Sequence, residues 1–442
     1  MTLRERILAG RFLTLCVFLV AGAAITLFLF ATVHNRSGSE LLEHSGARRS
    51  YNTITYWNDH GYFASGGVIN LVAPPGSPAP RMFYRTSTGA YMISGYLLEK
   101  TAFLTTGTYR WRLLAIHNSI LMMLTAALIA LFAYRLLARI GLERRYALVF
   151  AVGTLAVYIT FPDVLAQYWE LSAHAAAIPF AILFLLLDDL QSSGQKRQIL
   201  EAIRIAAAFG VTYFEFIFGT FFLLSYCAVV LLRDASRERV RELVFKALLP
   251  AAAALILFQG QLALVRITHP DVPFTGSEFM FRTGFDGSTV YYHGHEDILY
   301  GRNVARRNFP ANRAFLFRWP SLFIAGALAA GFVVSAGAVN DPLRPLLTIL
   351  PLMGAYVIYA ALFSQAVVIH PYYYDILIAT PLMIALFAFA PALLEMRFQT
   401  RGVVTLITML AALSYSMVQI RDYAMWYPLP QVKSSEHRPQ TK

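Results

Sequence analysis

The chain has few cysteines and few charged residues. Only two of its 442 residues are cysteines, Cys16 and Cys227, and both lie in apolar stretches. They provide neither a disulfide framework nor a thiolate metal site. Charged residues make up 14% of the sequence, whereas a typical soluble domain has about 25%. With 57% hydrophobic residues, this composition excludes a soluble multidomain protein.

Several catalytic signatures are absent as well. The sequence has no serine nucleophile elbow, no Walker-type phosphate loop, no dinucleotide fingerprint and no HExxH motif. Their absence argues against a membrane hydrolase, an ATP-driven pump and a zinc protease. The net charge of +12 does not indicate nucleic acid as a partner, because the positive residues flank apolar segments, as they do in membrane proteins.

What the chain does contain is a series of apolar runs long enough to cross a bilayer. At roughly 20 residues a span, they predict an all-α polytopic membrane protein with about eleven transmembrane helices. The short pair 199–214 and 216–232 also fits a re-entrant hairpin. The predicted spans are 12–33, 111–134, 146–162, 171–188, 199–214, 216–232, 247–266, 319–338, 345–364, 373–392 and 402–420.

Charge in the short loops predicts the orientation. The first apolar stretch is too long for a signal h-region of about 7–15 residues and has no small-residue cleavage site after it, so we expect a retained span. Lys and Arg gather in the loops assigned to the cytoplasm, while the outer turns 163–170, 213–216 and 364–372 have none. The N-terminus is therefore expected inside and the C-terminus outside.

Two segments are too polar to span and form large outer loops, 34–110 and 267–318. The first contains an amphipathic stretch, Ala90 to Leu104, expected as a helix on the membrane surface, and the second has no clear period. Together with the spans these loops form one domain, 1–420, followed by a polar C-terminal tail, 421–442. Two large loops on one face predict that the protein works on that face.

The ionisable residues that we identify inside or beside the spans lie at their outer ends. They are Asp59, Glu170, His174, Glu215, His370 and Asp375. The first belongs to the stretch Tyr56-Trp57-Asn58-Asp59-His60-Gly61-Tyr62. An aspartate between aromatic residues near the bilayer is expected to be partly desolvated, which favours a general base. The alternative is an Asx turn in which Asp59 caps a following helix.

Arginine clusters in both outer loops are candidates for holding a phosphate. Arg85 stands with Arg81 beside hydroxyl residues and a glycine, and the second cluster contains Arg302, Arg306 and Arg307. Guanidinium groups bind phosphate through charge-assisted hydrogen bonds. Contact with lipid headgroups is the alternative for both clusters.

Other polar groups have weaker assignments. We assign no metal site; the only candidate ligands are His293, His295 and Glu296, and a polar surface turn explains them equally well. Tyr373 and His370 lie in a tyrosine-rich stretch of the kind against which sugar rings pack. Glu215, in a tight outer turn, either caps the next helix or lines a site.

The order of these features resembles the GT-C superfamily of membrane glycosyltransferases, in the branch of protein O-mannosyltransferase and lipid A aminoarabinose transferase. Three stretches carry the resemblance. The first of them also differs from many relatives, which have a paired Asp-Glu where this chain has Asn58-Asp59-His60. The stretches are Tyr56-Trp57-Asn58-Asp59-His60-Gly61-Tyr62, Thr86-Ser87-Thr88-Gly89-Ala90-Tyr91, and His370-Pro371-Tyr372-Tyr373-Tyr374 with the later Pro381.

The resemblance implies a GT-C-like bundle in the plasma (inner) membrane with its active site on the outer face. It implies a polyprenyl-phosphate sugar as donor and a glycan, lipid or protein as acceptor. A divalent cation, Mg²⁺ or Mn²⁺, stays open. Asp59 would be the general base of an inverting transfer. The candidate substrate-binding residues are His60, Tyr62, Arg85, Glu215, Arg302, Arg306, Arg307, His370 and Tyr373.

Two other functions remain open. A lipid-linked saccharide ligase or polymerase also needs large outer loops and arginines, but it does not require an early aspartate in the first loop. A lipid or sugar transporter (flippase) needs many spans, charges near the membrane midplane and matched broken helices.

Overall fold

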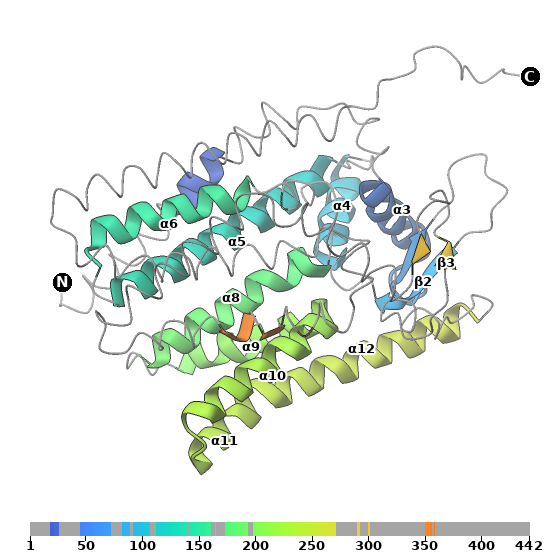
Figure 1. Cartoon of the computed structure of the whole chain (residues 1–442). Coiled ribbons are helices and arrows are strands. Elements are labelled where there is room, and N and C mark those ends of the chain that lie inside the picture. Colours follow the sequence, from blue (N-terminus) through green and yellow to red (C-terminus); the bar gives the residue numbers. More distant parts are fainter. Residues whose placement is uncertain are drawn as a thin grey trace, which may run out of the picture.

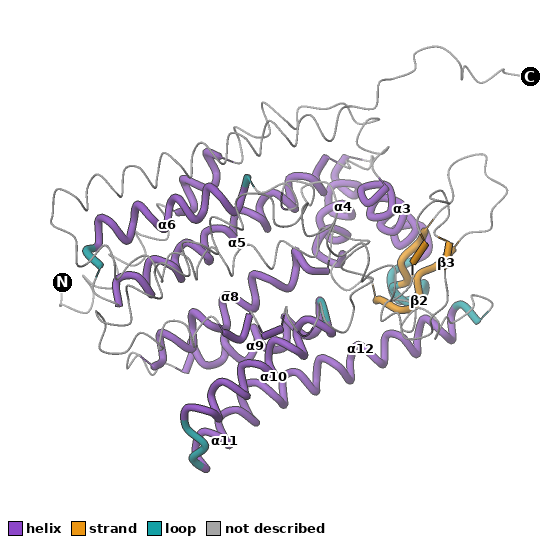
Figure 2. Tube along the Cα trace, in the orientation of Figure 1, coloured by secondary structure: helices purple, strands orange, loops and turns teal. Residues whose placement is uncertain are grey.

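The computed structural model is almost entirely helical (Figures 1 and 2). The helices are α3 (Ser45–His60), α4 (Ile93–Thr106), α5 (Arg112–Arg139), α6 (Arg144–Ile159), α8 (Ala173–Ser192), α9 (Gln198–Phe214), α10 (Phe216–Arg233), α11 (Arg237–Leu243) and α12 (Leu249–Thr268), with a π-helical segment η2 (Val244–Leu248) between the last two. The structure describes residues 18–25, 45–71, 82–88, 92–106, 112–139, 142–160, 164, 173–192, 198–270, 290–291, 299–300, 350–352, 354–355 and 358.

Three helices in this part of the chain are long and apolar enough to cross a membrane. They are Ile116–Ala138, Phe216–Arg233 and Arg237–Thr268. They coincide with three predicted spans, although the third begins ten residues earlier than 247, because its first turns are polar. The α6 helix, with 16 residues, and α9, with 17, are shorter than the roughly 20 residues that span a bilayer. The protein is therefore a helical membrane-associated chain, and the number of eleven spans stays a prediction.

Five predicted spans lie wholly or mostly beyond the described residues. They are 12–33, 319–338, 345–364, 373–392 and 402–420.

Successive long helices run in opposite directions (Figure 1). The α5 helix packs along α6, α8 packs along both α5 and α9, and α9 also packs on α10 and α12. The last residues of α5, α8 and α10 and the first residues of α6, α9 and α11 consequently lie at one end of the bundle, which we call the α11 end (Figure 1). The first residues of α5 and α8, and the turn between α9 and α10, lie at the other end, which we call the α3 end (Figure 1).

Small residues bring the helices close together. The core cluster includes alanines of α5, α6, α8 and α9 that are fully or almost fully buried, such as Ala126, Ala147, Ala181 and Ala208. At Gly219 in α10, an added Cβ would lie 2.5 Å from the Thr212 Cα and from the Val211 carbonyl oxygen. Close backbone approach at small residues is the usual packing of membrane helices, and here it joins α9 and α10 into a tight hairpin.

The first outer loop is more ordered than its composition predicted. Besides the expected helix, found as α4, it contains α3 and an antiparallel pair of strands, β1 (Val68–Leu71) and β2 (Met82–Thr88). The second loop contains another short pair, β3 (Val290–Tyr291) with β4 (Leu299–Tyr300). The strands β1, β3 and β4 are too short for an alternating pattern. The longer β2 does not alternate, because it has apolar residues at its start and only polar ones at its end.

All of these first-loop elements gather at the α3 end (Figure 1). The α3 helix packs on β1 and α4, α4 packs on the start of α5, and β2 lies against α12. The loop therefore forms a cap on one end of the helices, opposite the arginine-bearing connections. This arrangement agrees with the alternating topology expected from the sequence.

Candidate functional site

Trp57 anchors the helix that carries Asp59. Its side chain is fully buried, and its Nε1 donates a hydrogen bond of 2.8 Å to the Val68 carbonyl oxygen. The ring meets Tyr62 and Tyr96 edge-on, with centroids 4.9 and 5.7 Å away. Aromatic pairs in this geometry stabilise beyond their buried area. The last turn of α3 is therefore held against both β1 and α4.

The anchor leaves Asp59 and His60 on the outside. Both side chains are exposed. Asp59, two positions after Trp57, points to nearly the opposite side of a helix of 3.6 residues per turn, and His60 is the last residue of α3. The aromatic neighbours thus do not bury Asp59 as we expected. His60 stacks on Tyr56 with ring centroids 4.2 Å apart, and its Nδ1 lies 3.0 Å from the Tyr56 carbonyl oxygen.

The alternative assignment of Asp59 as the cap of a following helix is wrong. Asp59 lies in the last turn of α3, and the helix ends at His60. Gly61 follows with a φ of +82°, and its N–H donates to the Trp57 carbonyl oxygen at 2.8 Å. A glycine in the left-handed conformation is a common helix C-terminus. Gly61 therefore determines where Asp59 and His60 stand.

The turn after α3, residues 61–67, is bound to α12. The Gln261 Nε2 donates to the Tyr62 hydroxyl at 3.1 Å, and the His269 Nε2 lies 3.1 Å from the Ser65 carbonyl oxygen. Gly66 packs so closely that an added Cβ would lie 2.7 Å from the Thr268 Oγ1. We call these contacts the α12 clamp. Burial, and secondarily Tyr213, raises the pKa of Tyr62 far above its ordinary value, so its hydroxyl stays protonated.

Arg85 lies on the strand that pairs next to this turn. In the register, Ile69 faces Tyr84 and Val68 faces Thr88, so residues 85–87 form an irregularity in β2. Bulges of this kind are typical of sites that redirect side chains. Val68 is also the acceptor for Trp57. The backbone of the Arg85 motif therefore stands close to the helix that carries Asp59, although its side chain is not among those described.

Glu215 lies at the same end of the bundle. It occupies the N-cap position of α10, but its side chain makes no capping hydrogen bond, so capping is not its role. The preceding residue, Phe214, packs against the aromatic cluster around Trp57. Glu215 is thereby adjacent in the chain to the cluster that supports α3.

The other predicted site residues lie outside the described part of the chain. They are Arg302, Arg306, Arg307, His370 and Tyr373, together with the weak metal candidates His293, His295 and Glu296. Among described residues, no group of three or more His, Cys, Asp or Glu side chains is placed to hold a metal ion. The question of a divalent cation therefore stays open.

Sequence reasoning missed a buried acid in α4. Glu99 is only 1% exposed, and with Gly95 and Tyr96 it forms the inward side of the helix. Leu97 and Leu104, by contrast, are 56% and 75% exposed. The stretch was expected to be an amphipathic helix on the membrane surface, but α4 does not separate apolar and polar residues onto two faces. A single acid within an apolar stretch is the signal that identifies Glu99.

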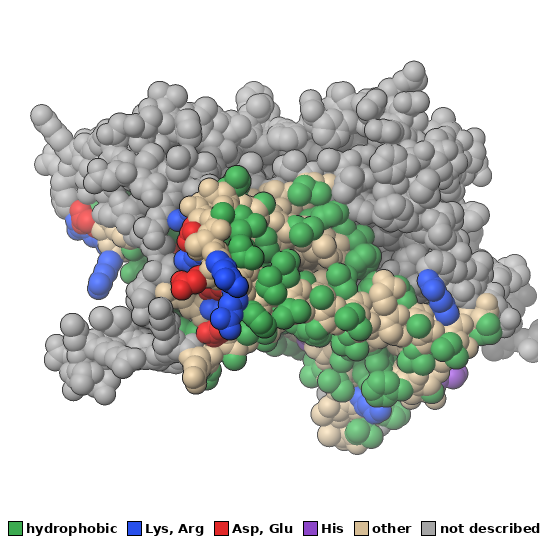
Figure 3. Space-filling view, turned by 90° about the horizontal axis from the view of Figure 1, so that it is seen from below, with side chains coloured by type: hydrophobic (Ala, Val, Ile, Leu, Met, Phe, Trp, Pro, Cys, Tyr) green, Lys and Arg blue, Asp and Glu red, His purple; other side chains and the backbone are tan. Residues whose placement is uncertain are grey.

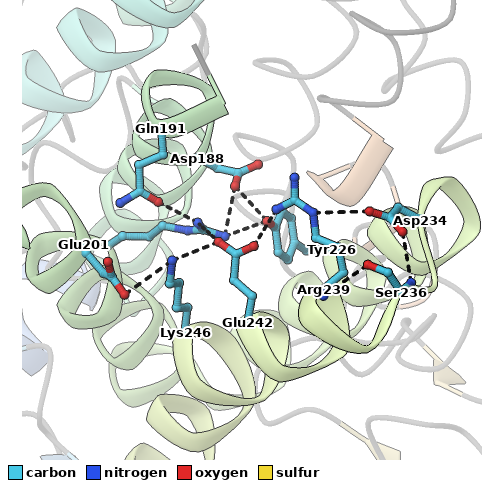
Figure 4. A network of polar contacts seen from close by, with 10 residues as sticks. Asp188, Gln191, Glu201, Tyr226, Asp234, Ser236, Arg239, Glu242 and Lys246 are labelled. Carbon is cyan, nitrogen blue, oxygen red and sulfur yellow. Dashed lines mark hydrogen bonds and ion pairs between the residues drawn. The ribbon is translucent and has the colours of Figure 1, made fainter. Parts of the chain in front are cut away.

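A second polar cluster, at the α11 end, was also missed (Figure 4). Its centre is Arg204 of α9, which is 1% exposed although it is charged. The guanidinium donates to the Tyr226 hydroxyl at 2.6 Å and to the Gln191 Oε1 at 2.8 Å, and its Nη2 lies 3.0 Å from an Asp188 oxygen. Ionisable groups inside apolar helices therefore occur at both ends of the bundle, not only at the outer end.

Glu242 of α11 connects this cluster to the long third span. Its carboxylate pairs with Arg239 and with Lys246, the latter at 2.9 Å, and lies 3.5 Å from Arg204. Lys246 also reaches Glu201 of α9 at 3.3 Å. These ion pairs connect α9 with α11 and η2 at the α11 end of the bundle. Because each cation has an acidic partner, the arrangement is structural rather than catalytic.

The α3 end therefore brings together Asp59, His60, Tyr62, the backbone of Arg85 and the turn at Glu215, all from elements held by one aromatic cluster and the α12 clamp. An exposed carboxylate on a fixed helix end is suited to accept a proton from a substrate.

Neither protein-family models nor curated proteins show a match to this chain.

Proposed function

We propose that the protein is a GT-C-like membrane glycosyltransferase that moves a sugar from a polyprenyl-phosphate donor to an acceptor on the outer face of the plasma membrane. The single observation that carries the proposal is the placement of Asp59. It is an exposed carboxylate at the end of a helix whose opposite side is fixed by the buried Trp57. The sequence resemblance assigns the same aspartate as the catalytic base.

The chemistry requires a base at this position. Asp59 takes the proton from the acceptor hydroxyl while that oxygen forms a bond to the anomeric carbon of the sugar. The bond between the anomeric carbon and the phosphate oxygen breaks, and polyprenyl phosphate leaves with both bonding electrons. Attack opposite to the leaving group inverts the anomeric configuration.

The leaving phosphate requires cations, and the proposal assigns this role to two groups of arginines. Arg85 is the nearest candidate along the fold, since its strand pairs with the one that follows the α3 turn. Arg302, Arg306 and Arg307 are the second group. Fixed guanidinium groups stabilise the charge that develops on a departing phosphate.

The proposal assigns the substrate side to polar and aromatic groups. His60 and Tyr62 follow Asp59 in the chain, and Tyr62 is held by Gln261. His370, Tyr373 and Glu215 complete the proposed set. Aromatic faces with polar edges suit sugar rings, which present both apolar faces and hydroxyl groups.

The test is transfer of labelled sugar by the purified full-length protein from a panel of polyprenyl-phosphate sugars, in the presence of an acceptor extract. Asp59→Asn keeps the shape of the side chain and removes the base, so we expect transfer to fall by a factor of about 10²–10⁴. Glu238→Gln is the matched control, because Glu238 is an exposed acid in α11 at the opposite end. Its removal should leave transfer unchanged.

Other outcomes have definite meanings. Equal transfer by wild type and Asp59→Asn would overturn the role of Asp59 and favour the ligase or polymerase. Absence of transfer by the wild type from every donor would overturn the enzyme assignment and favour transport.

A further inference from the structure

The first turns of the third candidate span carry two kinds of cations. Arg239 and Lys246 turn toward the bundle, where they pair with Glu242, and Arg239 also lies 3.7 Å from Asp234 (Figure 4). Arg237 and Arg241 lie on the same helix, but they face away from the bundle and are exposed. The inward and outward cations alternate along the sequence, so the two groups differ only in whether the side chain faces the bundle or faces away from it.

The outward cations have no acidic partner in this part of the chain. Arg237, Arg241 and the nearby Arg233 form no ion pair with any other described residue, in contrast to Arg239, Lys246 and the buried Arg204. An unpaired exposed guanidinium is a ready donor to a phosphate, because its planar fork can bind two phosphate oxygens at once.

The face that carries these arginines becomes apolar within one turn. The Arg241 guanidinium lies 5.9 Å from the centre of the Phe245 ring, on the same side of the helix. Phe245 is 55% exposed, Leu249 is 50% exposed and Ile256 is 74% exposed. From Arg237 onward, one outer face thus changes from cationic to apolar. Figure 3 shows charged residues gathered at this end of the described surface and an apolar area beside them.

We propose that Arg237 and Arg241, with Arg233, bind the phosphates of anionic phospholipids in the leaflet at the α11 end. The helix that follows them is long and apolar enough to cross a bilayer, so its change from charge to apolar surface matches the boundary between headgroups and hydrocarbon. The negative surface potential of an anionic leaflet attracts arginines at this depth.

This surface favours lipid over an acidic protein. A protein partner would have to cover Phe245 and Leu249 as well as the arginines, yet these residues continue without interruption into the apolar outer face of the span. A phospholipid matches both the cationic and the apolar part of this surface, because its phosphate contacts the guanidinium groups and its acyl chains contact the apolar side chains. The proposal is independent of the proposed enzymatic function.

The test compares binding of phosphatidylglycerol and phosphatidylcholine to the purified full-length protein in detergent, by native mass spectrometry over a lipid titration. We expect preference for phosphatidylglycerol, and we expect Arg241→Gln to weaken it by about five-fold and the double variant Arg237→Gln/Arg241→Gln by roughly twenty-fold. Binding of phosphatidylcholine should not change. In the wild type, raising the salt from about 0.1 M to about 1 M should remove most of the preference.

Arg145→Gln is the matched control. Arg145 is also exposed and also lies over an aromatic ring, with its guanidinium 4.9 Å from the centre of Tyr146, but it has a carboxylate partner in Glu143 at 2.8 Å. The control removes the same charge and should leave the lipid preference nearly intact. Equal losses in Arg145→Gln and Arg241→Gln would mean that binding follows net charge, and no loss in either would also overturn the proposal. Thermal unfolding of each variant establishes that it is folded.

Discussion

At the scale of single residues, the exposed pair Asp59 and His60 depends on residues that point the other way. Trp57 is buried and hydrogen-bonded to Val68, and Tyr62 is held by Gln261 from a distant part of the chain. The positions of Asp59 and His60 therefore depend on contacts made by other residues. Their position is set by aromatic packing on one side and by the α12 clamp on the other.

The hydrogen bond between Tyr62 and Gln261 gives a prediction at this scale. Tyr62→Phe and Gln261→Leu each remove one partner, and each should lower the free energy of unfolding by about 0.5–1.5 kcal/mol. The double variant should lose less than the sum, because both single changes break the same bond. Reversible unfolding in detergent measures the three values.

A pair of changes far apart in the structure offers the comparison. Leu243→Ala in α11 paired with Tyr62→Phe should give additive losses, since Leu243 is buried at the opposite end of the bundle from Tyr62. Additive losses for Tyr62→Phe with Gln261→Leu as well would contradict the clamp.

At the scale of elements, glycines decide how closely helices approach. Gly219 brings α10 against the backbone of α9, whereas Gly260 in α12 has no atom of a described residue within 4 Å of where a Cβ would stand. The same residue type therefore has opposite significance in the two helices. In α10 it permits packing, and in α12 it only lowers the helix propensity.

Alanine substitution at both glycines separates these roles. Gly219→Ala places a Cβ 2.5 Å from backbone atoms that cannot turn aside, so we expect a destabilisation of about 1–3 kcal/mol or more. Gly260→Ala meets no atom of the described part of the chain within 4 Å and should stabilise the protein by about 0.5–1 kcal/mol, as alanine does in a helix interior. Thermal unfolding of the two variants in one detergent gives the comparison. If Gly219→Ala did not destabilise the protein, the close approach of α9 and α10 would be wrong.

At the scale of the whole molecule, the described helices separate two polar ends. The first-loop elements lie at the α3 end, and the Arg204 cluster with α11 lies at the other (Figure 1). The apolar helices between them are the part suited to hydrocarbon. We therefore expect the two ends to face opposite compartments when the chain is in a membrane.

Cysteine labelling tests this arrangement. After Cys16 and Cys227 are replaced by alanine, Phe63→Cys and Glu238→Cys introduce single thiols at opposite ends; Phe63 is 80% exposed and Glu238 is also exposed. In intact cells, a membrane-impermeant maleimide should label only the thiol at position 63. The thiol at position 238 should react only after the membrane is opened. Labelling of both in intact cells would contradict the topology, and labelling of 238 alone would reverse the orientation.

The sequence by itself determined the membrane character of the chain and most of the described helix boundaries. Helices at 112–139, 198–214 and 216–233 fall close to their predicted positions, because hydrophobicity and length are local properties of about 20 residues. Position 59 also emerged from sequence alone, as an aspartate within an aromatic stretch soon after the first predicted span.

Only the tertiary structure decided which way these residues face. Tyr62 and Gln261 are 199 positions apart, and Arg204 is 38 from Glu242, so no local pattern joins them. The inward orientation of Glu99 and the outward orientation of Asp59 likewise follow from contacts between α3, α4, β1 and α12. A side chain's surroundings depend on which distant segments pack against its helix, and periodicity along one segment does not contain that information.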